Sequence, residues 1–299
     1  MNVLVLSGGI SAERDVSLRS GKAVADALGS SGHTVSVYDP KDGESGLLQA
    51  AQTVDVVFPA LHGVGGEDGV IQGLLEANHI PCVGSDSTAS QLCFHKQHYK
   101  DFLHQHGILM PSGELISETT FDTSVFSKAP FIIKPVDGGS TIDAFIVRDV
   151  TNYDYVAITS ALRRYGQMLI EQLVTGVEIT VGVLDDQPLP VIEIIPPENQ
   201  EFDYENKYNG ATQELCPPAH VSVRLQQQAQ QLAGNIHRLT GCRGMSRTDI
   251  IIDEQDKLWV LETNTIPGLT DQSLYPKAAR TAGVDMPELV DRLVRSATA

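Results

Sequence analysis

Four polar residues at the ends of two apolar runs form the pattern in this sequence that most clearly indicates chemistry. Arg247 and Asp249 begin one run, and Glu262 and Asn264 end the next, with a polar turn at 254–257 between them. Alternate side chains of a strand share a face, so each pair points to one side of a predicted hairpin. Carboxylate and amide oxygens suit Mg²⁺ held together with nucleotide phosphates, which predicts a metal site. The alternative is a solvent-exposed strand face with an ordinary acidic turn.

A glycine-rich turn follows a lysine in the middle of the chain. Lys134 ends an apolar strand candidate, and Gly139, Ser140 and Thr141 come soon after it. Glycine lets backbone N–H groups approach phosphate oxygens, and hydroxyl groups can donate hydrogen bonds as well. The pattern is typical of a phosphate-binding loop, and a simple glycine hairpin with an exposed lysine is the alternative.

Two further loops carry residues that could act on a charged substrate. His62 lies in a glycine-rich loop ahead of a predicted helix, where a catalytic role competes with a purely structural one. The polar stretch 196–212 interleaves aromatic and charged residues, Lys207 and Tyr208 among them. Such a long connection in a compact domain suits a lid over the substrate, and a solvated surface loop is the alternative.

Two weaker patterns complete the candidates. Gly8 and Gly9 follow the first strand candidate and could place backbone amides against an anion, although tight turns need glycine anyway. The segment from Glu171 to Glu178 could be a strand edge whose backbone contacts a flat base.

Hydrophobic patterns divide the chain into three predicted domains, 1–85, 86–180 and 181–299. The first alternates β-rich runs with helical patterns, as in a parallel sheet covered by helices, so the fold class is α/β and α+β. The expected strands are 3–6, 34–38, 54–58, 131–134, 144–147, 168–171, 177–184, 189–195, 247–253 and 258–264. The expected helices are 15–30, 68–78, 87–106, 223–240 and two more at the C-terminus.

Composition narrows the class of protein. The chain has 299 residues, 41% hydrophobic and 20% charged, which is ordinary for a globular protein of two or three domains. Its net charge of −17 argues against a nucleic-acid or anionic membrane partner. No apolar run approaches the roughly 18 residues that span a bilayer. The N-terminus reads as a strand rather than a signal peptide, so we expect a cytoplasmic protein.

Taken in order, these motifs resemble the D-alanine–D-alanine ligases of the ATP-grasp superfamily. The resemblance covers nearly the whole chain and rests on residues 7–14, 62–69, 134–135, 203–208, 247–249 and 262–270. It implies an ATP-grasp fold with an N-terminal parallel-sheet α/β domain, in which ATP lies between two antiparallel sheets.

The resemblance assigns an ATP site. It implies phosphate contacts from two lysines and the glycine-rich loop, and two Mg²⁺ ions, with Mn²⁺ as an alternative. The residues implied are Lys96, Lys134, Gly139 and Ser140 for the phosphates, Lys207 for the γ-phosphate, Glu171 for the adenine edge, Glu178 for the ribose, and Asp249, Glu262 and Asn264 for the metals.

The resemblance also assigns a substrate site, in which one D-alanine carboxylate is phosphorylated and the amine of a second D-alanine attacks the acyl phosphate. Arg247 and the Gly268 N–H would stabilise the oxyanion of the tetrahedral intermediate. The other implied residues are Glu13 for the first ammonium group, His62 near the reacting carboxylates, Ser273 and the Leu274 N–H for the second carboxylate, and Tyr208 and Thr141 for lid closure.

We therefore expect an enzyme that makes D-alanyl-D-alanine for peptidoglycan from ATP and D-alanine. Tyr208 favours the amide product, because related ligases that make a D-alanyl-D-lactate ester usually carry another residue there. Dimers are common in the family, and we expect a homodimer. The alternatives are an ATP-grasp ligase for a different amino or hydroxy acid, and a nucleotide-binding homologue without turnover.

The phosphate loop departs from the family pattern Lys-Pro-x-x-Glu-Gly-Ser-Ser-x-Gly. Gly138 replaces the acid, Thr141 replaces a serine, and Asp143 replaces the last glycine, whose backbone needs a positive φ if the turn is kept. A carboxylate beside a triphosphate is unfavourable unless it is paired or turned outward. We expect these changes, together with Asp137 of the same loop, to affect loop closure and ATP affinity more than the reaction class.

Overall fold

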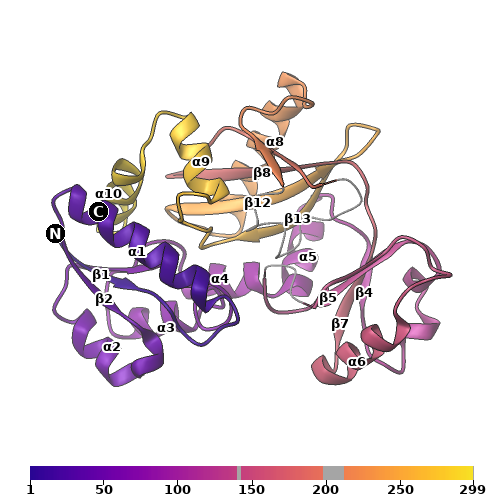
Figure 1. The fold of residues 1–299 in the computed structure, drawn as a ribbon, viewed down its shortest axis with the longest axis horizontal. Coiled ribbons are helices and arrows are strands. Elements are labelled where there is room, and N and C mark those ends of the chain that lie inside the picture. Colours follow the sequence, from indigo (N-terminus) through magenta and orange to yellow (C-terminus); the bar gives the residue numbers. More distant parts are fainter. Residues whose placement is uncertain (140–142, 198–211, 299) are drawn as a thin grey trace.

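The computed structural model describes residues 1–139, 143–197 and 212–298, which form three sheets with helices around them (Figure 1). The parallel sheet at the N-terminus has the order β2 (Thr34–Tyr38), β1 (Asn2–Leu6) and β3 (Val56–Pro59). Alternation along β1 sends Val3 and Val5 toward α1 (Arg14–Ser30) and α10 (Met286–Ser296), which share their hydrophobic core. Leu4 and Leu6 face α2 (Glu44–Ala51) and α3 (Val70–Ala77). The predicted parallel α/β sheet is confirmed.

A smaller antiparallel sheet occupies the middle of the chain. Its order is β4 (Gly113–Ile116), β7 (Met168–Gln172), β5 (Phe131–Pro135) and β6 (Phe145–Val147). Along β5, Phe131 and Ile133 are buried against α6 (Tyr155–Tyr165), which leaves Ile132 and Lys134 on the other face. That free face is the one available to a ligand.

The largest sheet lies opposite this face. It has the order β11 (Gln213–Leu215), β10 (Ile192–Ile195), β8 (Val177–Leu184), β12 (Met245–Ile252) and β13 (Leu258–Asn264), with β9 (Gln187–Pro188) paired to β8. The predicted hairpin is confirmed: Arg247 is opposite Asn264, and Asp249 is opposite Glu262. The long helix α8 (Val223–Leu239) packs on one side of the sheet, and α9 (Leu274–Thr281) contacts β8.

The helix expected at 87–106 is wrong as a single element. The chain forms α4 (Ser87–Phe94) and α5 (Lys96–Gln105), because His95 is extended and its Nδ1 accepts a hydrogen bond from His98 N at 3.2 Å. This side-chain cap begins a new helix at Lys96. The boundary predicted at residue 180 falls inside β8, and the division into three domains stays a prediction.

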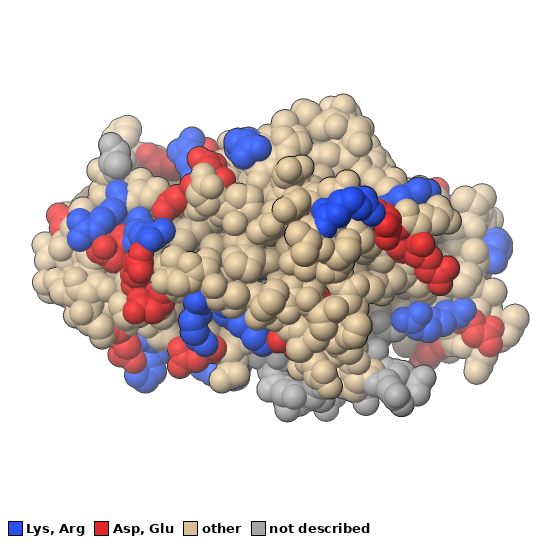
Figure 2. Space-filling model, turned by 90° about the horizontal axis from the view of Figure 1, so that it is seen from above, with Lys and Arg blue, Asp and Glu red and all other residues tan. Residues whose placement is uncertain are grey.

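Charged side chains on one face of the molecule form small groups of mixed sign toward its two ends, with uncharged residues over much of the middle (Figure 2). Among the described helices, none is both long and apolar enough to cross a membrane.

Candidate active site

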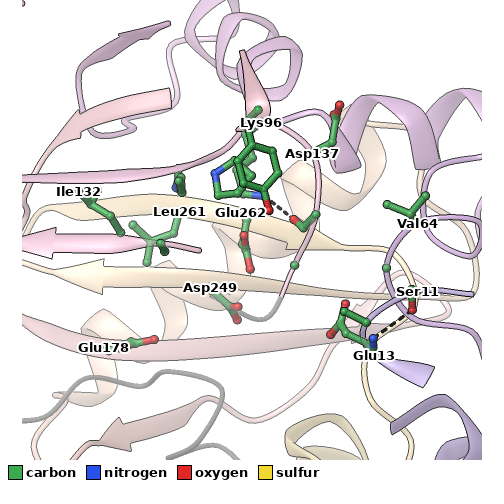
Figure 3. A pocket seen from close by; sticks show the side chains of 18 residues that line it. Ser11, Glu13, Val64, Lys96, Ile132, Asp137, Glu178, Asp249, Leu261 and Glu262 are labelled. Carbon is green, nitrogen blue, oxygen red and sulfur yellow. Dashed lines mark hydrogen bonds between the residues drawn. The ribbon is translucent and has the colours of Figure 1, made fainter. Parts of the chain in front are cut away.

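A central cavity lined by both antiparallel sheets collects charged residues from five elements (Figure 3). β5 contributes Lys134, β8 contributes Glu178, and the β12–β13 hairpin contributes Asp249 and Glu262. Lys96 reaches the same space from the first residue of α5. Glu13 and Asp137 also line it, so two cations share one cavity with five carboxylates, an arrangement that suits a polyanion accompanied by metal ions.

An apolar cavity adjoins the central cavity and shares Lys134 and Glu178 with it. Its walls are apolar side chains of both sheets, with the backbone of 172–177 along one edge. The apolar wall residues include Ile132, Ile146, Ile194, Ile251 and Leu261, and Arg148, Glu193 and His220 also line the cavity. Such a slot can take a flat ring between its walls, while backbone N–H and C=O groups read the edge of the ring.

Glu171 lies at the inner end of the apolar cavity between two lysines. Its Oε2 is 2.7 Å from Lys134 Nζ, and its Oε1 pairs with Lys100 Nζ. Burial alone would raise the pKa of Glu171, but the two ammonium groups lower it, so the carboxylate is charged. Lys134 and Glu171 were predicted from the sequence, and Lys100 was missed. The only signal for Lys100 is its position one helical turn after Lys96.

Lys96 ties the glycine-rich loop to the start of α5. Its Nζ donates to the Gly138 carbonyl, and its backbone N donates to the Val136 carbonyl at 3.0 Å. Gly139 follows, and a Cβ placed there would come within 3.3 Å of Glu13 Oε2. The loop therefore brings the central cavity and the Glu13 carboxylate together.

Asp143, the unusual acid of this loop, is paired with neighbouring side chains and is not among the described residues that line the cavity. Its φ is +56°, the left-handed region that the family glycine would adopt easily. Its carboxylate lies 2.8 Å from Arg164 Nη2 and accepts a hydrogen bond from the Tyr165 hydroxyl at 2.6 Å. The positive φ and the pairing expected for an acid at this position are therefore both present.

The residues predicted to bind metal face one another across the hairpin. The Asp249 carboxylate accepts from Arg247 Nη2 at 2.8 Å, from Arg247 Nε at 3.0 Å and from the Thr180 hydroxyl at 2.5 Å. Asn264 Oδ1 accepts from Ile266 N at 2.9 Å, which orients its amide. In the described residues no three His, Cys, Asp or Glu side chains are grouped for a metal. Two carboxylates and an amide nevertheless fit Mg²⁺ when phosphate oxygens complete the shell.

An N-terminal cavity, on the other side of Glu262, gathers the residues predicted for the substrate. Six of the predicted residues line it together: Glu13, His62, Arg247, Gly268, Ser273 and Leu274. Ser273 precedes α9, so the Leu274 N–H lies at a helix start, where the dipole favours an anion. Burial opposes the charged form of Arg247, but the Asp249 carboxylate raises its pKa, so the cation is permanent.

His62 contacts two segments that are distant in the sequence, α1 and the loop after β13. Its Nε2 is 2.9 Å from Ser20 Oγ, and its ring makes a second hydrogen bond with the backbone of Ile266. Burial lowers the pKa of His62 to about 4, so the ring is neutral at neutral pH. These contacts join His62 to α1 and to the loop before Gly268, and its place near the reacting carboxylates stays a prediction.

Glu67 is a second residue that the sequence interpretation did not single out. Its Oε2 accepts from Gly63 N at 2.8 Å, and it lines the N-terminal cavity. Burial, together with the charge of Glu13, raises the pKa of Glu67 to about 8. The sequence pattern that could have identified Glu67 is the motif 62–69, which also contains His62.

The Gly8–Gly9 turn holds a carboxylate of the protein itself: the Gly9 amide donates to Asp39 Oδ1 at 2.9 Å, while the Gly8 amide donates to Ser17 Oγ at 2.8 Å. Four predicted residues lie outside the described part of the chain, and their roles stay predictions: Ser140, Thr141, Lys207 and Tyr208.

Known proteins resemble this chain along its whole length. A family model for the D-ala D-ala ligase C-terminus matches residues 113–295, and one for the D-ala D-ala ligase N-terminus matches residues 41–85. The D-alanine–D-alanine ligase of Sphingopyxis alaskensis is 42% identical over 304 residues, covering 99% of this chain and 97% of that protein.

Solved structures give the same result. The D-alanine–D-alanine ligase of Bacillus anthracis has a TM-score of 0.85 and 28% identity over 99% of this chain and 97% of its own. The same ligase complexed with ATP has a TM-score of 0.83 and 27% identity, with the same coverage. Sequence and fold therefore agree. The chain belongs to the D-alanine–D-alanine ligase family and has its ATP-grasp fold.

Proposed function

We propose that this chain joins two D-alanine molecules into D-alanyl-D-alanine, with conversion of ATP to ADP and phosphate, for peptidoglycan synthesis. The observation that carries the proposal is that Glu262 and Glu13 line both the central cavity and the N-terminal cavity. A triphosphate in the first and an amino acid in the second would therefore meet at these residues. This junction is what a carboxylate phosphorylation requires.

The nucleotide would lie across the apolar and central cavities. Its base fits between Ile132 and Leu261, and Glu178, which lines both cavities, is placed for the ribose. Lys96 and Lys134 would then neutralise phosphate charge in the central cavity. Phosphoryl transfer depends chiefly on such positioning and charge neutralisation.

Mg²⁺ is part of the proposal, with Mn²⁺ as a substitute. Asp249, Glu262 and Asn264 supply hard oxygen donors at the junction of the two cavities. When bound there, the metal would supply charge neutralisation at the transferring phosphate.

The chemistry has two displacements. An oxygen of the first D-alanine carboxylate bonds to the γ-phosphorus as the bond to ADP breaks. The amine of the second D-alanine then bonds to the carbonyl carbon, phosphate leaves, and the nitrogen gives up a proton. Arg247 and the Gly268 N–H line the cavity where the negative oxygen of the tetrahedral intermediate develops, and donors placed there lower that barrier. Glu13 would pair with the ammonium group of the first D-alanine.

The two alternatives from the sequence rested on the altered phosphate loop. Asp143 is paired with Arg164 and Tyr165, which weakens them, whereas Asp137 lines the central cavity and keeps part of their motive. A cytoplasmic location and a homodimer remain part of the proposal on family grounds.

The test is a product assay with Mg-ATP and D-alanine, in which released phosphate and dipeptide are both quantified. The proposal expects ADP, phosphate and D-alanyl-D-alanine in equal amounts. A faster reaction with another amino or hydroxy acid would show that D-alanine is not the preferred substrate. ATP binding without product from any of them would leave only a nucleotide-binding protein.

A further inference from the structure

Lys100 is a buried lysine paired with Glu171, which lines the apolar cavity. It lies on α5, its side chain is 2% exposed, and its Nζ donates to the Pro111 carbonyl and pairs with Glu171 Oε1. An ammonium group is expensive to bury, so its position needs a reason beyond packing.

The reason lies in the charges around Glu171. Lys100 pairs with one oxygen of this carboxylate, and Lys134 lies 2.7 Å from the other. Two cations against one anion leave the group with a net charge of +1. Of the three, Lys134 is the most exposed, at 13% against 2% for the others, and it lines both nucleotide cavities. Without Lys100, the carboxylate of Glu171 would neutralise the charge of Lys134.

We propose that Lys100 is a positioning residue for ATP, which holds Glu171 through one oxygen and so leaves the charge of Lys134 available to the nucleotide phosphates. This rests on the proposed use of ATP. Lys100 is not among the residues that line the cavities, and it acts through Glu171. Its span from α5 to β7 also fixes which way the Glu171 carboxylate faces.

The test compares the affinities of ATP and adenosine, measured by calorimetry, in wild type and in Lys100→Met. Methionine keeps an unbranched apolar chain as far as Cε and removes the charged Nζ. Because adenosine carries no phosphate, the ratio of the two affinities reports the charge seen by the phosphates. The ratio should fall about tenfold or more in Lys100→Met, the scale of one lost charge contact. The KM for ATP should rise with it, while kcat at saturating ATP changes far less.

Charge compensation separates this role from simple packing. In the double variant Lys100→Met with Glu171→Gln, the net charge of the group returns to +1, carried by Lys134. The ATP-to-adenosine ratio should then return close to that of wild type. This variant also lacks an uncompensated buried carboxylate, so it serves if the single variant does not fold. The matched control is Lys22→Met, which removes an exposed lysine paired with Asp26 and should leave the ratio unchanged.

The outcomes are distinguishable. A wild-type protein that fails to bind ATP overturns the proposed function, and this inference with it. Wild-type binding with an unchanged ratio in Lys100→Met overturns the role of Lys100 alone. A ratio that stays low in the double variant shows that Lys100 only fills space, and it also overturns the inference.

Discussion

Arg247 and Asp249 hold each other through two hydrogen bonds, Nη2 to Oδ2 at 2.8 Å and Nε to Oδ1 at 3.0 Å. They are two residues apart on β12, so strand geometry puts them on one face. One is proposed to stabilise the oxyanion and the other to bind metal. The pair therefore links the two halves of the reaction, and neither side chain can move without affecting the other.

Glu262→Gln should lower kcat at least a hundredfold, because one charged oxygen donor at the cavity junction becomes a neutral amide. The melting temperature should stay within a few degrees of wild type. Steady-state phosphate release and calorimetry measure the two effects. Glu254→Gln, in the exposed turn of the same hairpin, is the control. Wild-type turnover in Glu262→Gln would remove this residue from the proposed site.

Arg247→Lys should keep the charge but lose the two-point contact with Asp249, since an ammonium group lacks the planar fork of guanidinium. We expect kcat to fall roughly 10²–10³-fold, the usual cost of one oxyanion donor. Arg243→Lys is the matched control, because its side chain is 71% exposed and pairs with Asp86. Equal effects of the two substitutions would contradict the role of Arg247.

The contribution of two buried histidines to stability should fall as the pH is lowered from 7 to 5, whereas Glu67, whose pKa is raised to about 8, contributes in the opposite direction. Burial lowers the pKa of both His62 and His237 to about 4, below the ordinary value of 6.5. Between these values the unfolded chain binds more protons, so each histidine contributes stability above pH 6.5 that is lost as the pH falls toward 4. The expected loss from pH 7 to 5 is about 1–2 kcal/mol per histidine.

Urea unfolding at the two pH values measures this loss. His237, whose Nδ1 is 2.7 Å from Ser246 Oγ, lies away from the active site and is the residue to replace. In His237→Gln, the free energy of unfolding at pH 7 minus that at pH 5 should be lower than in wild type by about 1–2 kcal/mol, the contribution of one histidine. An unchanged difference would show that His237 titrates normally in the folded protein.

Asp143 gives a test of the altered phosphate loop. Because its φ is +56°, Asp143→Ala should cost about 1 kcal/mol of backbone strain, whereas Asp143→Gly should not. Both lose the contacts with Arg164 and Tyr165, so the difference between the two isolates the backbone term. Chemical unfolding measures the stability of each variant. Equal stabilities would show that residue 143 does not have a positive φ in the folded protein.

The sequence was sufficient for elements with a strong local pattern. The alternation from Arg247 to Ile252 and from Leu258 to Asn264 predicted the hairpin with its polar ends, and the pairing of Asp249 with Glu262 follows from it. The parallel strands of the first domain were predicted for the same reason. Weakly patterned segments such as α2, β4 and α6 were missed.

What the sequence could not supply were contacts between distant segments. Lys100 of α5 pairs with Glu171 of β7, and no local spacing encodes that pair. Ser20 contacts His62 although the two residues are 42 positions apart, so the sequence alone could not show this partner. The break at His95 depends on a single side-chain cap that overrides an otherwise continuous helical pattern.

The most direct test of the account follows isotope from substrate to product. D-alanine labelled with ¹⁸O in its carboxylate is incubated with Mg-ATP and the enzyme, and the phosphate and dipeptide are analysed by mass spectrometry. Because a carboxylate oxygen attacks the γ-phosphorus and leaves with the phosphate, each phosphate should carry one ¹⁸O. Unlabelled phosphate formed together with dipeptide would contradict the acyl phosphate route and the meeting of the two cavities at Glu262.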